Sequence, residues 1–240
     1  MAMNRLLYIE TVDSTNHFLK THWTDFTHGT SVRAGFQTAG RGLAQNSWES
    51  DAGKNLLMST LIFPQIPAAE QFKVNMLYVR GIYELLSQFQ GIKIKWSNDI
   101  YYNDRKLGGI LIEHGIEGEH IKYSICGIGL NINQTEFSNR LPNPVSLKQI
   151  TGIEQDVTHW AQQIHKNILH AFETHEKESF EDLKSVYLKS LYRFNEKHLF
   201  KDNSGVFQAK IIDINPFGML VLETDSQEIK VFGFKEIVFV

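Results

Sequence analysis

A short segment that begins at Lys95 carries several side chains able to bind an anion. Lys95 and Lys106 stand near its two ends, and Asn98-Asp99 follows an aromatic residue. Apolar and polar residues alternate on both sides of Asn103-Asp104, which predicts a β-hairpin that brings the two lysines together. Gly108-Gly109 interrupts the second strand, as happens where another backbone or a ligand comes very close. The segment therefore predicts a site for a small anionic ligand.

A glycine-punctuated loop, residues 37–50, is a second candidate binding segment. Gly40 and Gly42 flank Arg41, so backbone N–H groups and a guanidinium can surround an anion. A single Gly-x-Gly is more often a simple turn. Trp48, near the end of the loop, is either a core residue or a surface on which a base stacks. Loops of this length are usually functional or disordered.

Two polar stretches lie at the ends of predicted elements. Asp13 or Ser14 can cap a helix predicted over about 17–23 by accepting a backbone N–H. The same hydroxyls and the amide of Asn16 can instead hold a polar ligand group. Asn131 follows Gly127-Ile128-Gly129 at the end of a predicted strand, where its side chain can reach a ligand. The glycines alone indicate no more than a bulge.

Strands and helices must position these residues. Amphipathic spacing predicts helices over 68–89, over 160–172 and over 180–194, the last capped by Ser179. Strands are predicted at 6–9, 30–36, 55–63, within the hairpin and on to residue 113, and at 121–126; residues 137–156 are predicted to be loop. From about residue 201 the pattern changes to short strands at 206–214, 219–223, 229–232 and 237–240 with turn residues between them. This pattern predicts a small barrel of the SH3 type, so the predicted domains are 1–198 and 199–240.

The composition is that of an ordinary globular protein. Among 240 residues, 42% are hydrophobic and 21% charged, which predicts a sizeable core. A net charge of −3 gives no general reason to expect nucleic acid or a membrane surface as a partner. The one cysteine, Cys126, excludes an intramolecular disulfide and is predicted to be an inert buried thiol. No signal peptide or membrane-spanning run is visible, and we predict a cytoplasmic protein.

Four motifs, taken together in their order along the chain, closely resemble the biotin protein ligases, over roughly residues 8 to 135. The resemblance implies an α+β fold, with a mixed sheet and flanking helices like the catalytic domain of class II aminoacyl-tRNA synthetases and biotin ligases. It also implies a small C-terminal SH3-like β-barrel. The motifs are Asp13-Ser14-Thr15-Asn16, Gly40-Arg41-Gly42 with Asn46 and Trp48, Lys95-Trp96-Ser97-Asn98-Asp99 with Lys106-Leu107-Gly108-Gly109-Ile110-Leu111, and Gly127-Ile128-Gly129-Leu130-Asn131. The third of these, from Lys95 to Leu111, is the most specific.

The reaction that the resemblance implies depends on ATP. The biotin carboxylate attacks the α-phosphorus of ATP, giving biotinyl-5′-AMP and pyrophosphate. A lysine of a biotin carboxyl carrier protein or domain then takes the biotinyl group. Because two anions must meet, fixed cations and Mg²⁺ are needed to offset their repulsion.

The resemblance assigns roles to individual residues. Lys106 would bridge the biotin carboxylate and the α-phosphate, with Arg41, Lys95 and Asp99 as further catalytic residues; Asp99 would deprotonate the acceptor lysine. The metal is expected through the ATP phosphates, with Asn98 and Asp99 close by. The residues expected to bind biotin are Ser14, Thr15, Asn16, Gln37, Gly40, Arg41, Lys106 and Gly109. Those expected to bind the nucleotide are Arg41, Gly42, Asn46, Trp48, Lys95, Asn98 and Asn131. The loop over 40–48 is expected to close over the adenylate and exclude water.

The chain departs from the family pattern at three positions. Leu43 and Asn46 stand where many relatives carry basic side chains, and Ser97 replaces the usual proline. The first predicted strand begins near residue 5, which leaves no room for the N-terminal helix-turn-helix of the bifunctional ligase-repressors. We therefore expect a monofunctional ligase without sequence-specific DNA binding. We also expect no membrane binding, and a homodimer as one possible assembly.

Two alternatives stay open. A lipoate ligase or octanoyltransferase shares the catalytic fold, but those transferases need a nucleophilic cysteine or a different glycine-rich motif, and Cys126 is poorly placed for that role. A non-catalytic binding module is the other alternative. The retention of Lys106, Arg41 and Asn131 argues against it.

Overall fold

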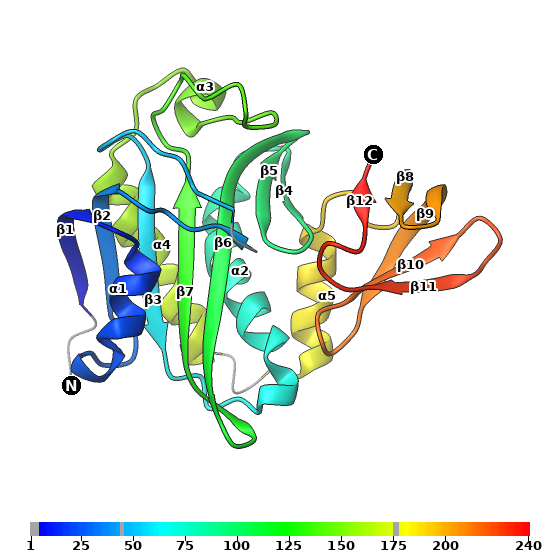
Figure 1. The fold of residues 1–240 in the computed structure, drawn as a ribbon, viewed down its shortest axis with the longest axis horizontal. Coiled ribbons are helices and arrows are strands. Elements are labelled where there is room, and N and C mark those ends of the chain that lie inside the picture. Colours follow the sequence, from blue (N-terminus) through cyan, green and yellow to red (C-terminus); the bar gives the residue numbers. More distant parts are fainter. Residues whose placement is uncertain (1–4, 44–45, 175–177) are drawn as a thin grey trace.

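The computed structural model describes residues 5–43, 46–174 and 178–240. In this part of the chain the larger sheet has seven strands in the order β1-β2-β3-β7-β6-β5-β4 (Figure 1). β1 runs parallel to β2 and the other neighbours are antiparallel, so the predicted mixed sheet is confirmed. The strands are β1 (Leu6–Val12), β2 (Ser31–Gln37), β3 (Leu56–Ile62), β4 (Ile92–Lys95), β5 (Asp99–Tyr102), β6 (Arg105–Glu117) and β7 (His120–Leu130).

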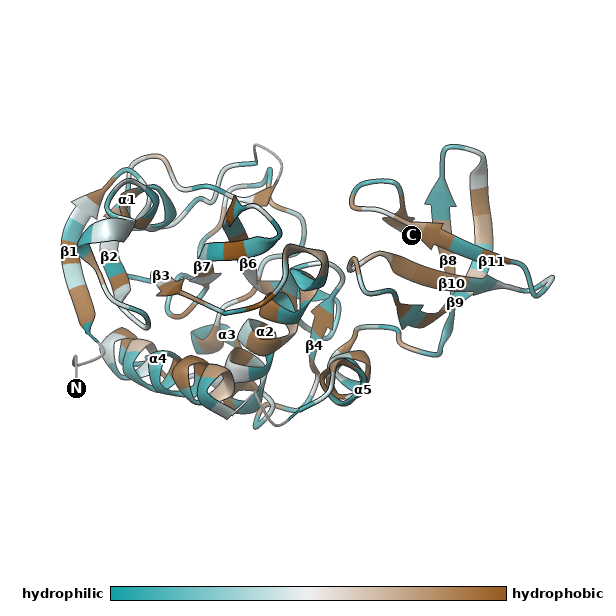
Figure 2. Cartoon of the chain, turned by 90° about the horizontal axis from the view of Figure 1, so that it is seen from below, coloured by the Kyte–Doolittle hydropathy of each residue, from teal (hydrophilic) through white to brown (hydrophobic). Residues whose placement is uncertain are grey.

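Helices cover both faces of this sheet. α1 (Thr15–Thr21) lies on one face, and α2 (Phe72–Leu86) and α4 (Val157–Thr174) lie on the other (Figure 2). Every residue of the central strand β3 is buried, because layers on both sides exclude water from it. The remaining helical segments are α3 (Leu147–Thr151), α5 (Phe180–Ser190) and two short 3₁₀ turns, η1 (Trp23–Asp25) and η3 (Ala68–Glu70).

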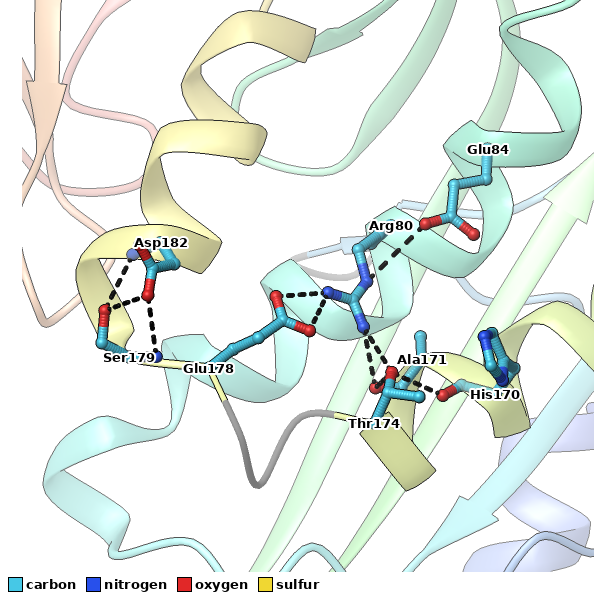
Figure 3. Close-up of polar contacts among 8 residues, drawn as sticks. All are labelled: Arg80, Glu84, His170, Ala171, Thr174, Glu178, Ser179 and Asp182. Atoms are coloured by element: carbon cyan, nitrogen blue, oxygen red, sulfur yellow. Dashed lines mark hydrogen bonds and ion pairs between the residues drawn. The ribbon is translucent and has the colours of Figure 1, made fainter.

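Arg80 on α2 links α2 to α4, the two helices on the same face of the sheet (Figure 3). Its Nη1 donates to both carboxylate oxygens of Glu178 at 2.6 Å. Its Nη2 donates to the carbonyl oxygen of Ala171 at 3.1 Å and to Oγ1 of Thr174 at 3.0 Å, near the end of α4. The Arg80 side chain is only 13% exposed, so this paired and hydrogen-bonded charge fixes how α2 and α4 pack behind the sheet.

The predicted hairpin forms at one edge of the sheet. β5 and β6 are joined through Asn103, whose φ of 50° lies in the left-handed region that asparagine tolerates. Asp99 pairs with Lys95 on one side and with Gly109 on the other. A bulge between Ile100 and Tyr101 shifts the register before Lys106. The hairpin thus brings the charged residues of the segment onto neighbouring strands.

The smaller sheet is antiparallel, in the order β11-β10-β9-β8-β12, and lies beside β4 and α5 (Figure 1). Its strands are β8 (Lys197–Asp202), β9 (Gly205–Ile214), β10 (Leu220–Thr224), β11 (Ile229–Phe232) and β12 (Val238–Phe239). Phe200, Ile211 and Leu222 belong to the same hydrophobic cluster as the core of the larger sheet. The two sheets are therefore packed together, and the predicted boundary after residue 198 falls inside β8.

Two predicted elements differ from the structure, and one strand was not predicted. β7 does not end at Cys126 but continues through the glycines to Leu130, because β3 and β6 pair with it on both sides. The predicted loop over 137–156 contains α3, whose start is fixed by a capping box between Ser146 and Gln149. β8 was not predicted, because its charged residues hide the alternation. No helix in the described ranges is long and apolar enough to cross a membrane.

Candidate active site

A cavity opens where α1, the loop after β2, the β5–β6 hairpin and β7 meet. Met58 and Ser59 of β3 and Phe234, between β11 and β12, complete its wall. Most of the residues singled out from the sequence line this cavity: Ser14, Thr15, Asn16, Gln37, Arg41, Gly42, Asn46, Trp48, Asn98, Asp99, Lys106 and Gly109. The fold therefore brings segments that are far apart in the sequence into one site.

One end of the cavity is a network of uncharged polar groups. Gln37 Oε1 accepts the backbone N–H of Thr15 at 2.8 Å and lies 3.0 Å from the Thr15 hydroxyl. That hydroxyl lies 2.7 Å from Ser59 Oγ, which donates to Asn16 Oδ1 at 2.6 Å. Thr15, Asn16 and Ser59 are all buried. Such a closely spaced set of donors and acceptors suits a small polar ligand group with donors and acceptors of its own.

Ser14 stands at the N-cap of α1, but its side chain makes no capping hydrogen bond. The Asp13 carboxylate accepts the N–H of Ser14 itself, at 2.6 Å, and not that of a residue inside the helix. The predicted cap by one of these side chains therefore does not form. Ser14 is 2% exposed and lines the cavity, so its hydroxyl is positioned for a ligand.

Glycines of β6 and β7 form the floor of the cavity. A Cβ at Gly127 would lie 2.2 Å from Asn16 Oδ1, and a Cβ at Gly129 would lie 2.4 Å from the indole of Trp48. At Gly109 a Cβ would lie 3.2 Å from the same indole. These positions need glycine because side chains of the site lie directly against the backbone. The glycines in β7 are thus part of a packed floor. The bulge that the sequence suggested at these glycines does not occur.

The other end of the cavity is charged. Lys106 Nζ lies 2.7 Å from Asp99 Oδ1 and 5.8 Å from the centre of the Trp48 ring. Arg41, which is exposed, lines the same cavity. A cation fixed by a carboxylate beside an aromatic face can receive an anionic group at this end.

Three predicted site residues do not line the cavity. Lys95 Nζ donates to the Tyr101 hydroxyl at 3.2 Å and lies over the Tyr101 and Phe239 rings. Burial and the nearby cations of Arg193 and Lys106 lower the pKa of Lys95, against the opposing effect of Asp99.

Asn131 and Gly40 also lie behind the cavity wall. Asn131 is 5% exposed, and its Nδ2 donates to the Val145 carbonyl oxygen at 3.0 Å. Gly40 accepts the N–H of Trp48 at 3.0 Å, and a Cβ there would lie 2.5 Å from the Trp48 carbonyl oxygen. Both residues therefore shape the segments that carry the site, and their predicted contacts with ligands stay predictions.

The glycine-rich loop is described on both sides of residues 44 and 45. The N–H of Gly42 donates to the Asn46 carbonyl oxygen at 2.7 Å, which closes the loop on itself. Leu43 and Asn46 line the cavity at the positions where the sequence departs from the family pattern. Residues 44 and 45 lie outside the described part of the chain, and closure of the loop over a ligand stays a prediction.

Sequence reasoning missed Ser59, Glu113 and Phe234, which lie at or near the cavity. Ser59 stands inside the apolar run of β3, where one polar residue among buried aliphatic ones was the available signal. Glu113 accepts from Asn16 at 3.1 Å and from Lys20 at 2.8 Å. Although burial raises the pKa of Glu113, hydrogen bonds from Lys20 and Asn16 hold it below its usual range. Phe234 comes from a distant part of the sequence and gave no signal.

The smaller sheet contacts the site through Trp96 and Phe234. The Trp96 indole N–H donates to the Gly218 carbonyl oxygen at 2.9 Å, and its ring lies 6.4 Å from that of Phe234. Gly218 has a φ of 81°, and a Cβ there would lie 2.3 Å from the Phe72 ring. The turn before β10 therefore contacts α2 and the β4–β5 connection, beside the cavity.

The chain was compared with known proteins. The family model described as "Biotin/lipoate A/B protein ligase family" matches residues 8–131. The bifunctional ligase/repressor BirA of Bacillus subtilis is 30% identical over 210 residues, which cover 85% of this chain and 65% of that protein. This chain thus spans slightly under two thirds of that relative's length.

Two solved structures share the fold over nearly the whole chain. The biotin protein ligase from Aquifex aeolicus in complex with biotin and ATP aligns with a TM-score of 0.80 at 24% identity, covering 98% of each chain. Its R40G mutant in complex with biotin aligns with a TM-score of 0.78 at 25% identity, covering 99% of each. Both alignments include the smaller C-terminal sheet.

Proposed function

Because the chain belongs to the biotin/lipoate A/B protein ligase family, we propose that it activates biotin with ATP and transfers it to a lysine of a biotin carboxyl carrier protein. The proposal is carried by one observation. A single cavity holds an uncharged polar network at one end and the Lys106–Asp99 pair at the other, over a glycine floor. Biotin has a cyclic urea at one end, an apolar tail and a carboxylate at the other, so its groups match the cavity in kind and order.

The charged end suits the first half-reaction. A carboxylate oxygen of biotin attacks the α-phosphorus of ATP, a P–O bond forms, and the bond to the leaving pyrophosphate breaks. Lys106 can neutralise negative charge that the carboxylate and the phosphate share in the transition state. The Arg41 guanidinium, which lines the same cavity, offers a fork of donors to phosphate oxygens.

The second half-reaction consumes the mixed anhydride. The acceptor lysine attacks the acyl carbon as a neutral amine, an amide bond forms, and AMP leaves. Asp99 is the carboxylate in the cavity that can take the proton lost by the amine. Phe234 and Trp48 narrow the cavity and help to keep water from the anhydride.

The donor set also fits a magnesium ion bound with the nucleotide. Mg²⁺ uses oxygen ligands and is commonly held by one or two carboxylates together with substrate phosphates. Asp99 and the amide oxygen of Asn98 are the oxygen donors that line the charged end. When bound there, the ion would supply charge neutralisation to the phosphates. No group of three or more His, Cys, Asp or Glu side chains that could hold a metal ion occurs in the described ranges.

Lipoate ligase or octanoyltransferase activity is the competing function within the family. The dithiolane ring of lipoate has no N–H or carbonyl group, so it would cover the polar network of Thr15, Asn16 and Ser59 without forming hydrogen bonds to it. Octanoyl transfer through a cysteine is disfavoured because Cys126 is fully buried and does not line the cavity. Burial raises the pKa of the Cys126 thiol well above its usual range. These observations favour biotin.

The finer statements on partners and location belong to the same proposal. We propose a carboxyl carrier domain as the acceptor and the cytoplasm as the place of the reaction. Sequence-specific DNA binding is not part of the proposed role.

A labelling assay tests the proposed function. The chain is incubated with ATP, Mg²⁺, biotin and a carboxyl carrier domain, and the acceptor is analysed by mass spectrometry. We expect one biotinyl group on one lysine, and no product when lipoate replaces biotin. A carrier that stays unmodified, or one modified by lipoate in preference, would reject the assignment.

A further inference from the structure

The side-chain amide of Asn16 is held at both ends. Its Nδ2 donates to Glu113 Oε2 at 3.1 Å and to the Leu111 carbonyl oxygen at 3.3 Å, while its Oδ1 accepts from Ser59 at 2.6 Å. The Glu113 carboxylate and the Leu111 carbonyl can only accept. A turned amide would place Oδ1 against two acceptors, so the oxygen of Asn16 must face Ser59.

The protons of two hydroxyls then follow from this orientation. Thr15 and Ser59 carry one hydroxyl proton each. They take part in three close contacts: Ser59 with Asn16 at 2.6 Å, Thr15 with Ser59 at 2.7 Å, and Thr15 with Gln37 at 3.0 Å. Ser59 must give its proton to Asn16. The Thr15 hydroxyl then has two acceptors within reach, Ser59 at 2.7 Å and Gln37 at 3.0 Å, and it donates to Ser59 because two lone pairs facing each other across the shorter contact would repel. No proton remains for the contact between Thr15 and Gln37.

This contact therefore places two acceptors side by side at the cavity wall. Gln37 Oε1 is fixed as the oxygen because it accepts the Thr15 backbone N–H at 2.8 Å. Thr15 Oγ1 and Gln37 Oε1 both belong to residues that line the cavity. An N–H group of a ligand that points between them would satisfy both oxygens.

We propose that Glu113 is a positioning residue that fixes the Asn16 amide and thereby makes the Thr15–Gln37 pair a receptor for a ligand N–H donor. The donor is an N–H of the biotin ureido ring, an identification that rests on the proposed function. Glu113 acts through a directed chain of hydrogen bonds, from Thr15 to Ser59 to Asn16 to its own carboxylate. It does not itself line the cavity.

Lys20 gives the proposal a sharp test. Its Nζ lies 2.8 Å from Glu113 Oε1, the oxygen that Asn16 does not use. In Glu113→Gln, Lys20 retains the amide oxygen and the new NH₂ group faces Asn16. The new NH₂ group opposes Asn16 Nδ2 across the shorter of its two contacts, 3.1 Å against 3.3 Å to the Leu111 carbonyl oxygen, so we expect the Asn16 amide to turn. The chain of hydrogen bonds then reverses, and Thr15 donates to Gln37. Adding Lys20→Met frees the amide oxygen to face Asn16, which restores the original direction.

Calorimetry on the full chain measures the effect, with biotin and ATP as separate probes. We expect Glu113→Gln to weaken biotin binding about tenfold, the cost of one lost hydrogen bond to a buried group, with ATP binding unchanged. Lys20→Met alone and the double variant should bind biotin within about threefold of the parent chain. Glu117→Gln is the matched control, since Glu117 pairs with Lys122 at 2.9 Å on the same strand, away from the cavity. Normal biotin binding by Glu113→Gln, or a double variant no better than it, would overturn the proposal.

A second measurement separates this proposal from the proposed function. The side-chain amide resonances of Asn16, followed by NMR without ligand, should shift in Glu113→Gln and return in the double variant. If they do so while the parent chain binds no biotin, the positioning role stands and the biotin assignment fails. If biotin binds but the resonances do not respond, the positioning role alone is rejected.

Discussion

The Lys106 ammonium and the Asp99 carboxylate lie 2.7 Å apart on adjacent strands of one hairpin. The two side chains are 31% and 36% exposed and both line the cavity. The cation is thus held in place by a carboxylate that an anionic substrate can replace. This pair is the centre of the first two predictions.

Replacing Lys106 by alanine should abolish adenylate formation while leaving the fold intact. The side chain is partly exposed, so alanine should be tolerated by the fold, whereas charge stabilisation of this kind contributes about 10²–10³-fold to rate. Pyrophosphate release measures activity, and the melting temperature reports the fold. Lys122→Ala removes an exposed lysine that also pairs with a glutamate and serves as control. Near-normal pyrophosphate release in Lys106→Ala would refute the role.

Asp99→Asn separates the two half-reactions. If Asp99 takes the proton of the acceptor lysine, the variant should form the adenylate but transfer biotin slowly, by about 10²-fold. Single-turnover transfer from preformed biotinyl-5′-AMP to a carrier domain measures the second step alone. Raising the pH should partly recover the rate, because more of the acceptor amine is then neutral. Transfer at the normal rate would remove Asp99 from this role.

The glycine floor predicts that two substitutions weaken the binding of different ligands. A Cβ at Gly127 would meet Asn16 Oδ1 at 2.2 Å, and a Cβ at Gly129 would meet the Trp48 ring at 2.4 Å. Gly127→Ala should therefore weaken biotin binding about tenfold or more by displacing Asn16, with a smaller effect on ATP. Gly129→Ala should displace Trp48 and weaken nucleotide binding. Each variant controls for the other, and equal losses of both ligands in both variants would contradict the prediction.

Two partly buried histidines predict a loss of stability on acidification. His114 Nδ1 lies 2.8 Å from Ser124 Oγ and His165 Nδ1 lies 2.8 Å from Ser31 Oγ. Burial lowers the pKa of both rings. Below the ordinary pKa of about 6.5 the unfolded chain then binds more protons than the folded chain, so the free energy of unfolding decreases as the pH falls.

Urea unfolding at several pH values between about 5 and 8 measures this slope. The midpoint should be highest above about pH 7, and the double variant His114→Asn/His165→Asn should show a shallower decline. His159→Asn, at an exposed position, should keep the slope of the parent chain. An undiminished slope in the double variant would show that other groups cause the decline.

The residues with distinctive local patterns were predictable from the sequence. The alternation around Asn103 and the glycines after Lys106 correctly indicated a hairpin with a close approach. At Gly108 a Cβ would lie 2.8 Å from the Gly129 carbonyl oxygen. The four motifs contain most of the predicted residues that line the cavity, because neighbouring strands of one sheet bring segments that are distant in the sequence side by side.

The rest depended on contacts that sequence spacing does not encode. Ser59 is hidden in an apolar strand, and its importance follows only from its distance to Asn16. Lys95 carries the expected charge, but strand pairing directs it to Tyr101 and the smaller sheet. Five-residue α3 is too short for periodicity to reveal, although the Ser146 capping box marked its start. Long-range packing decides such positions, and local propensity does not.

The cavity draws on Ser14 at one end of the chain and Phe234 at the other. Synthesis proceeds from the N-terminus, so the polar end and the hairpin emerge from the ribosome long before the aromatic residue that completes the wall. A nascent chain can thus assemble the groups that recognise a ligand before it can shelter a reactive intermediate. Because Phe234 follows β11, the wall of the cavity can be completed only after most of the smaller sheet has been synthesised.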